Sequence, residues 1–178
     1  MKKITLNLIL ILTLTSLLSA ATIVVDLAGG GDYTSIHEAV ENASDHDTVL
    51  VMSGTFIISA TDGGITVDKT LHMLGSGYDA PEDGGTFIQS ATSVFDFTSN
   101  ADGSTIRGFR IYGYGAPMIS ILADDMIIEE NHMTNSYNQG YIMQISSASS
   151  DTLRNNIFGF NGPGYRPGIS VSQTTDVT

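Results

Sequence analysis

Short apolar segments recur along this chain at intervals of 22 to 26 residues. Three segments that align without a gap begin at Thr105, Ile127 and Thr152. A second series of apolar pairs runs beside the first, at Ile119/Ile121, Met143/Ile145 and Ile169/Val171. Such periods are typical of solenoids, in which each repeat packs on its neighbours. Leucine-rich repeats share this range, but their leucine spacing is absent, so the pattern predicts a β-helix.

The repeat also predicts which side chains stack. Residues two apart point to the same side of a strand, so each apolar pair should point into the core. Asn131 and Asn156 occupy one repeat position, where Phe109 stands one repeat earlier. Asparagines turned inward at a bend hydrogen-bond to the turns above and below them. We therefore expect a short asparagine ladder that begins at Asn131.

One segment has helical periodicity instead. Its apolar face consists of residues spaced i, i+3, i+4 and i+7, namely Ile36, Ala39, Val40 and Ala43. Ser35 and Glu38 have the spacing of a capping box. The open end of a strand stack exposes unpaired backbone and apolar side chains. An amphipathic helix at residues 35–43 is suited to cover that end as a cap.

The N-terminus predicts export. Lys2 and Lys3 precede an apolar stretch at residues 6–18, and small residues follow at 19–21. This order is typical of a secretory signal peptide, and the stretch is too short to span a bilayer comfortably. We assign residues 1–20 to the signal peptide and residues 21–178 to the mature chain. The mature protein should leave the membrane and be secreted, lie at the cell surface or remain in the periplasm.

The charge of the mature chain excludes one class of partner. Without Lys2 and Lys3 it has 5 Lys and Arg against 19 Asp and Glu, a net charge of 5 − 19 = −14. No basic stripe is present, so nucleic acid is not a predicted partner. Cysteine is absent, which excludes disulfides. Stability should therefore come from packing and backbone hydrogen bonds.

The C-terminal end predicts a truncated solenoid. The sequence stops at Thr178, soon after the segment at residues 169–171 opens a new turn, and nothing resembling a cap follows. We expect the natural chain to continue with further coils or with a C-terminal sorting domain.

Several segments resemble the opening of pectin-lyase-like β-helix proteins, the group that includes pectin methylesterases. The segments are residues 24–26, 31–36, 38–40, 47–51 with 54–56, and 71–77. The resemblance covers residues 22–178 and implies an all-β fold, a right-handed parallel β-helix. It is far less specific for activity, because one fold hosts many functions.

The catalytic signatures of these families are incomplete here. Residues 54–58 lack the tyrosine and the acid that pectin methylesterases carry after the early glycine. Of the polygalacturonase motifs only Asp124-Asp125 matches, and Arg166-Pro167 is a fragment of the pectate lyase segment. No catalytic residue is assigned, and whether the protein is an enzyme stays open. If it is one, the resemblance implies a polysaccharide lyase, an esterase or a glycoside hydrolase.

The densest acidic cluster consists of Asp124, Asp125, Glu129 and Glu130. Such carboxylates can bind Ca²⁺ or act as a pair in glycoside hydrolysis. Polar residues are expected at a bend in every turn, however, and Asp102 occupies an equivalent bend. We interpret the cluster as solvated turn and strand residues, with Arg107, Glu129 and Arg154 stacked as surface ion pairs. We predict no metal ligand and no cofactor, with weak Ca²⁺ binding, here or at residues 79–85, as the open alternative.

Aromatic residues follow each repeat strand and predict a binding surface. Stacked turns place equivalent loops on one side of a solenoid, and a tyrosine offers a flat apolar face and a hydroxyl that suit sugar rings. The predicted ligand-binding residues are Tyr112, Tyr114, Tyr137, Tyr141, Tyr165 and Arg166. Phe158, at a repeat position, should pack into the coil instead.

Three functions remain open. The one we favour is an exported β-helix that binds a polysaccharide or a cell-surface glycan without catalytic residues in this segment. The alternatives are the N-terminal part of a pectin lyase-, pectinesterase- or polygalacturonase-like enzyme, and a surface adhesin.

Overall fold

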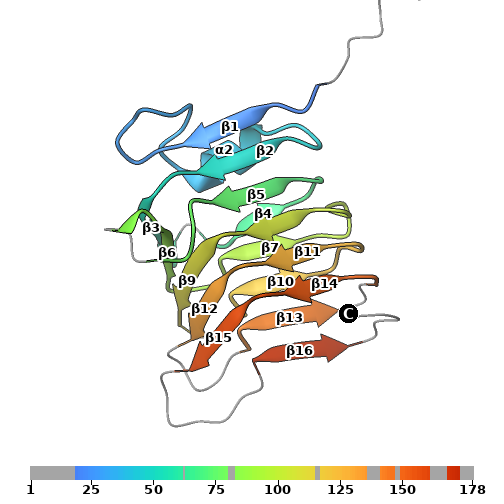
Figure 1. The fold of residues 1–178 in the computed structure, drawn as a ribbon. Helices are drawn as coiled ribbons and strands as arrows, with labels where there is room; N and C mark the ends of the chain where they lie inside the picture. Colours follow the sequence, from blue (N-terminus) through green and yellow to red (C-terminus); the bar gives the residue numbers. More distant parts are fainter. Residues whose placement is uncertain are drawn as a thin grey trace, which may run out of the picture.

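The computed structural model describes residues 19–61, 63–79, 83–114, 117–135, 141–146, 149–160 and 168–172. Over these residues the chain forms a parallel β-solenoid of about five turns (Figure 1). Each complete turn supplies one strand to each of three sheets. The predicted signal peptide lies outside the described residues except for Ser19 and Ala20, which are exposed.

The strands of the three sheets are as follows. Sheet A has the order β1 (Thr22–Val25), β2 (Thr48–Val51), β5 (His72–Gly75), β8 (Thr105–Arg107), β11 (Ile127–Glu129) and β14 (Thr152–Arg154). Sheet B has the order β3 (Gly54–Ile58), β6 (Thr86–Ser90), β9 (Phe109–Gly113), β12 (His132–Asn135) and β15 (Ile157–Phe160). Sheet C has the order β4 (Ile65–Val67), β7 (Phe95–Phe97), β10 (Ile119–Ile121), β13 (Met143–Ser146) and β16 (Ile169–Ser172).

The strand register confirms the repeat alignment. Ile128 of β11 pairs with Ile106 of β8 and with Leu153 of β14. In sheet C, the partners of Met143 are Ile119 and Ile169. The side chains of Ile106, Ile128, Ile119 and Met143 are fully buried, and Leu153 and Ile169 in the last described turn are half-buried. Phe158 packs partly buried against the same core, as predicted.

The predicted asparagine ladder is present at the bend between sheets A and B. The side-chain oxygen of Asn131 accepts the backbone N–H of Phe109 at 3.0 Å, and that of Asn156 accepts the N–H of Asn131 at 3.0 Å. The amide groups donate back to the preceding turns, to the carbonyls of Ile106 at 3.0 Å and Ile128 at 2.7 Å. Each asparagine thereby satisfies backbone groups that would otherwise be buried without partners.

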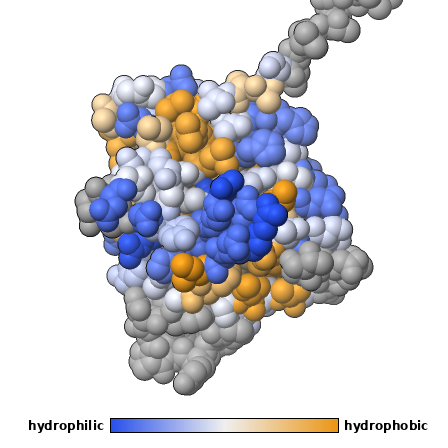
Figure 2. Space-filling view, viewed as in Figure 1, coloured by the Kyte–Doolittle hydropathy of each residue, from blue (hydrophilic) through white to orange (hydrophobic). Residues whose placement is uncertain are grey.

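The charged stack on sheet A is also present, with one correction. Arg107 and Arg154 flank Glu129 and both form ion pairs with it, and Arg107 also pairs with Glu130 at 2.6 Å. Glu129 is not solvated as predicted, since only 8% of it is exposed. The hydrogen bond from Arg154, together with the charges of both arginines, lowers the pKa of Glu129 despite its burial. Figure 2 shows a hydrophilic band across the middle of the molecule and an apolar patch toward the first strands.

Aspartates join successive turns at the bend that precedes sheet A. The Asp45 carboxylate accepts the backbone N–H of Thr70 at 2.8 Å. Asp102 likewise accepts the N–H of Asp124 at 2.8 Å, and Asp124 accepts that of Ser149 at 2.7 Å. These carboxylates therefore act as structural acceptors between turns.

The predicted capping helix is α2 (Ile36–Asn42). The hydroxyl of Ser35 accepts the backbone N–H of Glu38 at 3.4 Å, and the apolar face is buried. At the other end the Lys69 ammonium donates to three terminal carbonyls of the helix, at distances of 3.1 to 3.4 Å. The helix packs on β4, β1 and β2 at the N-terminal end of the stack (Figure 1). It is the one α-helix among the described residues.

Asp151 is buried differently from the other aspartates. Its Oδ1 accepts the N–H of Met126 at 3.0 Å, whereas its Oδ2 has no hydrogen-bond partner among the described residues. Burial, with a smaller contribution from the nearby charges of Asp124, Asp125 and Asp102, raises the pKa of Asp151 from 3.8 to about 6, although the hydrogen bond from Met126 acts in the opposite direction. The ionised carboxylate is therefore destabilising in the folded protein.

Replacing the stacked isoleucine tests the register. Ile128→Ala removes a fully buried side chain between Ile106 and Leu153. We expect the free energy of unfolding to fall by about 2–5 kcal/mol, as truncation of buried isoleucines does. Urea denaturation measures this change, and Ile127→Ala, on the outer side of the same strand, is the matched control. A change near zero for Ile128→Ala would mean that the register is wrong.

The buried aspartate predicts a pH dependence of stability. Because the folded pKa of about 6 lies above the unfolded value of 3.8, the contribution of Asp151 is fully present below about pH 4. It is lost as the pH rises through 6. We expect Asp151→Asn to raise the free energy of unfolding at pH 7 by about 1–3 kcal/mol and to flatten its decline between pH 4 and 6. Denaturation curves at several pH values measure this, and a less stable variant at pH 7 would contradict it.

Candidate binding face

The candidate site is the outer side of sheet B. Because side chains alternate along a strand, every second residue of β6, β9 and β12 points away from the core. Pairing places Phe87, Arg110 and His132 in one row across these strands. Gln89, Tyr112 and Thr134 form the next row. We use the name aromatic face for these outward residues and the tyrosines next to them, namely Tyr78, Phe87, Gln89, Arg110, Tyr112, Tyr114, His132 and Thr134.

Tyr114 is the exposed residue of the aromatic face, and it contacts the half-buried Tyr112. Their ring centroids are 5.4 Å apart and their planes meet at 87°, an edge-to-face arrangement. The two hydroxyl groups lie 3.4 Å apart, and 46% of Tyr114 is exposed. The sequence pattern had predicted that Tyr112 lies in the loop after the repeat strand. This was wrong, because Tyr112 lies within strand β9. Its ring is therefore held by a paired strand, which fixes its direction.

Arg110 lies over an aromatic ring of one neighbouring strand and is paired in register with a histidine of the other. Its guanidinium lies over the ring of Phe87, 5.6 Å from the centroid, which is a cation–π contact. On the other side, Arg110 pairs in register with His132 of β12. The His132 ring meets the ring of Tyr78 edge-on at 6.4 Å, and its Nε2 lies 3.4 Å from the Thr134 hydroxyl. Hydrogen-bonding groups thus lie between flat apolar surfaces.

His132 is a neutral group on this face. Burial lowers its pKa below 6.5, and the positive charge of Arg110 lowers it further. A neutral imidazole has one donor and one acceptor nitrogen. At pH 7 it can therefore both donate to and accept from a hydroxyl group of a ligand.

The electrostatics of sheet B differ from those of the whole protein. The chain has 19 Asp and Glu, but none of them lies in the five strands of sheet B. Sheets A and C carry Glu129 and Asp96 on their strands. Arg110 and the neutral His132 thus lie on strands that carry no carboxylate, so the charge within this face is positive although the chain as a whole is acidic.

Only part of the predicted site is brought together. Tyr112 and Tyr114 are in contact, whereas Tyr141 is half-buried just before β13, in the part of the turn that leads into sheet C. Tyr137, Tyr165 and Arg166 lie outside the described residues. The sequence analysis missed Phe87, Gln89, Arg110 and His132. Arg110 and His132 occupy one position of the repeat alignment, the residue after Phe109 and Asn131, and this position was not interpreted as part of the site.

Other chemistry has little support in the described residues. The Asp124 carboxylate accepts a backbone N–H, and Glu129 is paired with arginines. Within the described ranges, no three His, Cys, Asp or Glu side chains are grouped so that they could hold a metal ion. In the same part of the chain, no helix has the length and apolar character needed to cross a membrane.

Comparisons with protein-family models, with curated proteins and with solved structures found no match to this chain.

The environment of His132 makes a prediction that does not depend on a ligand. In Arg110→Gln the positive charge beside the imidazole is removed, so the pKa of His132 should rise but stay below 6.5, because burial is the larger cause. Nuclear magnetic resonance titration of the imidazole measures this shift. Gln144→Ala, on the outer side of sheet C, is the control variant and should leave the pKa of His132 unchanged. A falling pKa of His132 would contradict the described geometry.

Proposed function

We propose that this protein is an exported polysaccharide-binding protein built on a right-handed parallel β-helix of the pectin-lyase-like type. The observation that carries the proposal is the edge-to-face pair Tyr112/Tyr114 beside Arg110, on a sheet without carboxylates. Parallel strands in one sheet are almost always joined by right-handed crossovers, which supports the handedness. The basic, apolar and small residues of positions 1–20 support export.

The chemistry of the aromatic face fits sugar rings. Tyrosines bury large flat surfaces while each keeps a polar group. The rings of Tyr112 and Tyr114 supply such surfaces, and Arg110, His132 and Gln89 supply donors and acceptors on the neighbouring strands. Because paired strands hold these side chains in place, little freedom is lost when a ligand binds.

The ligand is a polysaccharide or a cell-surface glycan. Arg110 is the one charged side chain of the aromatic face at pH 7, since His132 is neutral there. A guanidinium can form two parallel hydrogen bonds with one carboxylate group, which favours an acidic glycan such as a polyuronate. We assign no catalytic residue, and the protein acts as a binding module in this proposal.

Affinity electrophoresis tests the proposal. The mature chain is run through gels that contain pectin, alginate or xylan, and we expect retardation by at least one of them. The double variant Tyr112→Ala/Tyr114→Ala should lose affinity by about tenfold or more, corresponding to about 1.4 kcal/mol. Gln144→Ala, on the outer side of sheet C, is the matched control and should migrate like the wild type.

Arg110→Gln separates acidic from neutral glycans. If this variant is no longer retarded by pectin and alginate but is still retarded by xylan, Arg110 binds carboxylate groups of the glycan. Equal retardation of the wild type and the double tyrosine variant, or no retardation of the wild type in any gel, would contradict polysaccharide binding by this face.

A further inference from the structure

The first turn of the solenoid is built differently from the others. It supplies β1 to sheet A, and helix α2 packs on β4, the first strand of sheet C. Over sheet B it supplies only the loop of residues 26–35. Leu27 of this loop lies over Gly54, where an added Cβ would be 3.0 Å from the leucine side chain. The rest of β3 is therefore the outermost strand of its sheet.

The outer edge of β3 has backbone groups available for pairing. The N–H of Gly54 donates to Gly85 at 3.1 Å, and the carbonyl of Ile58 accepts from Ala91 at 3.4 Å, both on the side of β6. Because backbone groups alternate between the two sides of a strand, those of Thr55 and Ile57 point the other way. Among the described residues, no strand pairs with β3 on that side.

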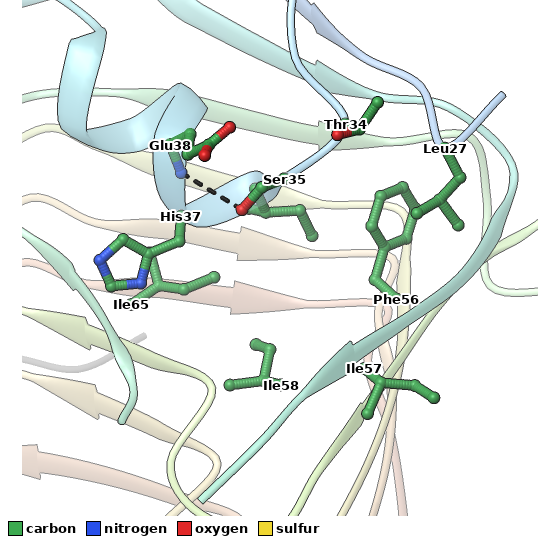
Figure 3. A pocket seen from close by; sticks show the side chains of 10 residues that line it. Leu27, Thr34, Ser35, His37, Glu38, Phe56, Ile57, Ile58 and Ile65 are labelled. Carbon is green, nitrogen blue, oxygen red and sulfur yellow. Dashed lines mark hydrogen bonds between the residues drawn. The ribbon is translucent and has the colours of Figure 1, made fainter. Parts of the chain in front are cut away.

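An apolar cleft lies beside this edge. It has a volume of about 500 Å³ and runs between β3 and the first turn of α2. Its walls include Leu27, Ile36, Phe56, Ile58 and Ile65, with Ile57 at the rim (Figure 3). Ile57 is 74% exposed, the highest value among the large apolar residues of the described chain.

The cleft is lined mostly by residues of an acidic segment of the chain. Residues 19–61 contain six Asp and Glu and no Lys or Arg. Glu38 is exposed and lines the cleft directly. Repulsion between like charges disfavours a second copy of the same acidic end as the occupant. The same negative charge attracts a cationic occupant.

We propose that this cleft binds an extended peptide segment of a partner protein, in which apolar residues alternate with Lys or Arg. The backbone of the segment pairs with Thr55 and Ile57 and adds a strand to sheet B, as in other strand-addition complexes. Its apolar side chains enter the cleft between β3 and α2, and its cationic side chains point to the opposite side of the added strand, where the net negative charge of residues 19–61 favours them. This site is separate from the aromatic face and does not depend on the proposed function.

Isothermal titration with short synthetic peptides tests this proposal. The probe is an acetylated and amidated peptide of alternating Lys and Val. Three matched peptides serve as controls. One replaces Lys with Glu, and the other two carry N-methyl groups on the Lys nitrogens or on the Val nitrogens, so that one edge or the other cannot pair. We expect the Lys peptide to bind, and the Glu peptide and one of the two N-methylated peptides to lose at least tenfold in affinity. Equal binding of the Glu peptide or of both N-methylated registers would overturn the proposal.

A variant of the protein provides a second test of peptide binding at this edge. Ile57→Pro removes an N–H that pairs with no described strand, and it blocks pairing at the outer edge, where proline is tolerated. Peptide affinity should fall at least tenfold, while circular dichroism and the thermal midpoint stay near those of the wild type. If Ile57→Pro does not fold, the N-methylated peptides decide with the wild-type protein alone. No binding of the Lys peptide, together with a wild-type dimer that Ile57→Pro makes monomeric, would overturn the proposal in favour of self-association.

Discussion

The fold depends on backbone hydrogen bonds between one turn and the next. Each strand of the three sheets pairs only with the equivalent strand one turn earlier or later, so the register of one turn fixes that of its neighbours. A shift by one residue would move every inward side chain outward. The apolar series through Ile106 and Ile128 therefore has to keep its spacing, and the bends have to absorb the changes in length.

The bends are stabilised by side chains that replace missing backbone partners. Asn131 and Asn156 link three turns at the bend between sheets A and B, and aspartates do so before sheet A. The residues just before the ladder, Gly108, Glu130 and Asn155, all have positive φ angles, between 54° and 78°. Such a repeated left-handed residue turns the chain sharply at the same place in each turn. The outward rows of sheet B inherit their alignment from these bends.

Part of this arrangement could be predicted from the sequence, because a regular repeat admits one register. The pairs of β8, β11 and β14 and the ladder at Asn131 follow from that register alone. The row that contains Phe87 could not be predicted, because a long loop breaks the period before β6. Gly54 of β3 therefore pairs with Thr86, 32 residues later. The place of Tyr112 inside β9 was missed because aromatic and glycine residues suggest a loop when pairing is unknown. The open edge of β3 depends on where α2 packs, which periodicity does not specify.

The central claim is that the outer side of sheet B is the surface that meets a polysaccharide. The most direct measurement is a two-dimensional amide spectrum of the mature protein titrated with oligosaccharides of the polymer that retards it. The account predicts chemical-shift changes concentrated at residues of β6, β9 and β12, with those of β10 and β13 unchanged. Shifts centred on sheet A or sheet C, or spread evenly over the molecule, would contradict it.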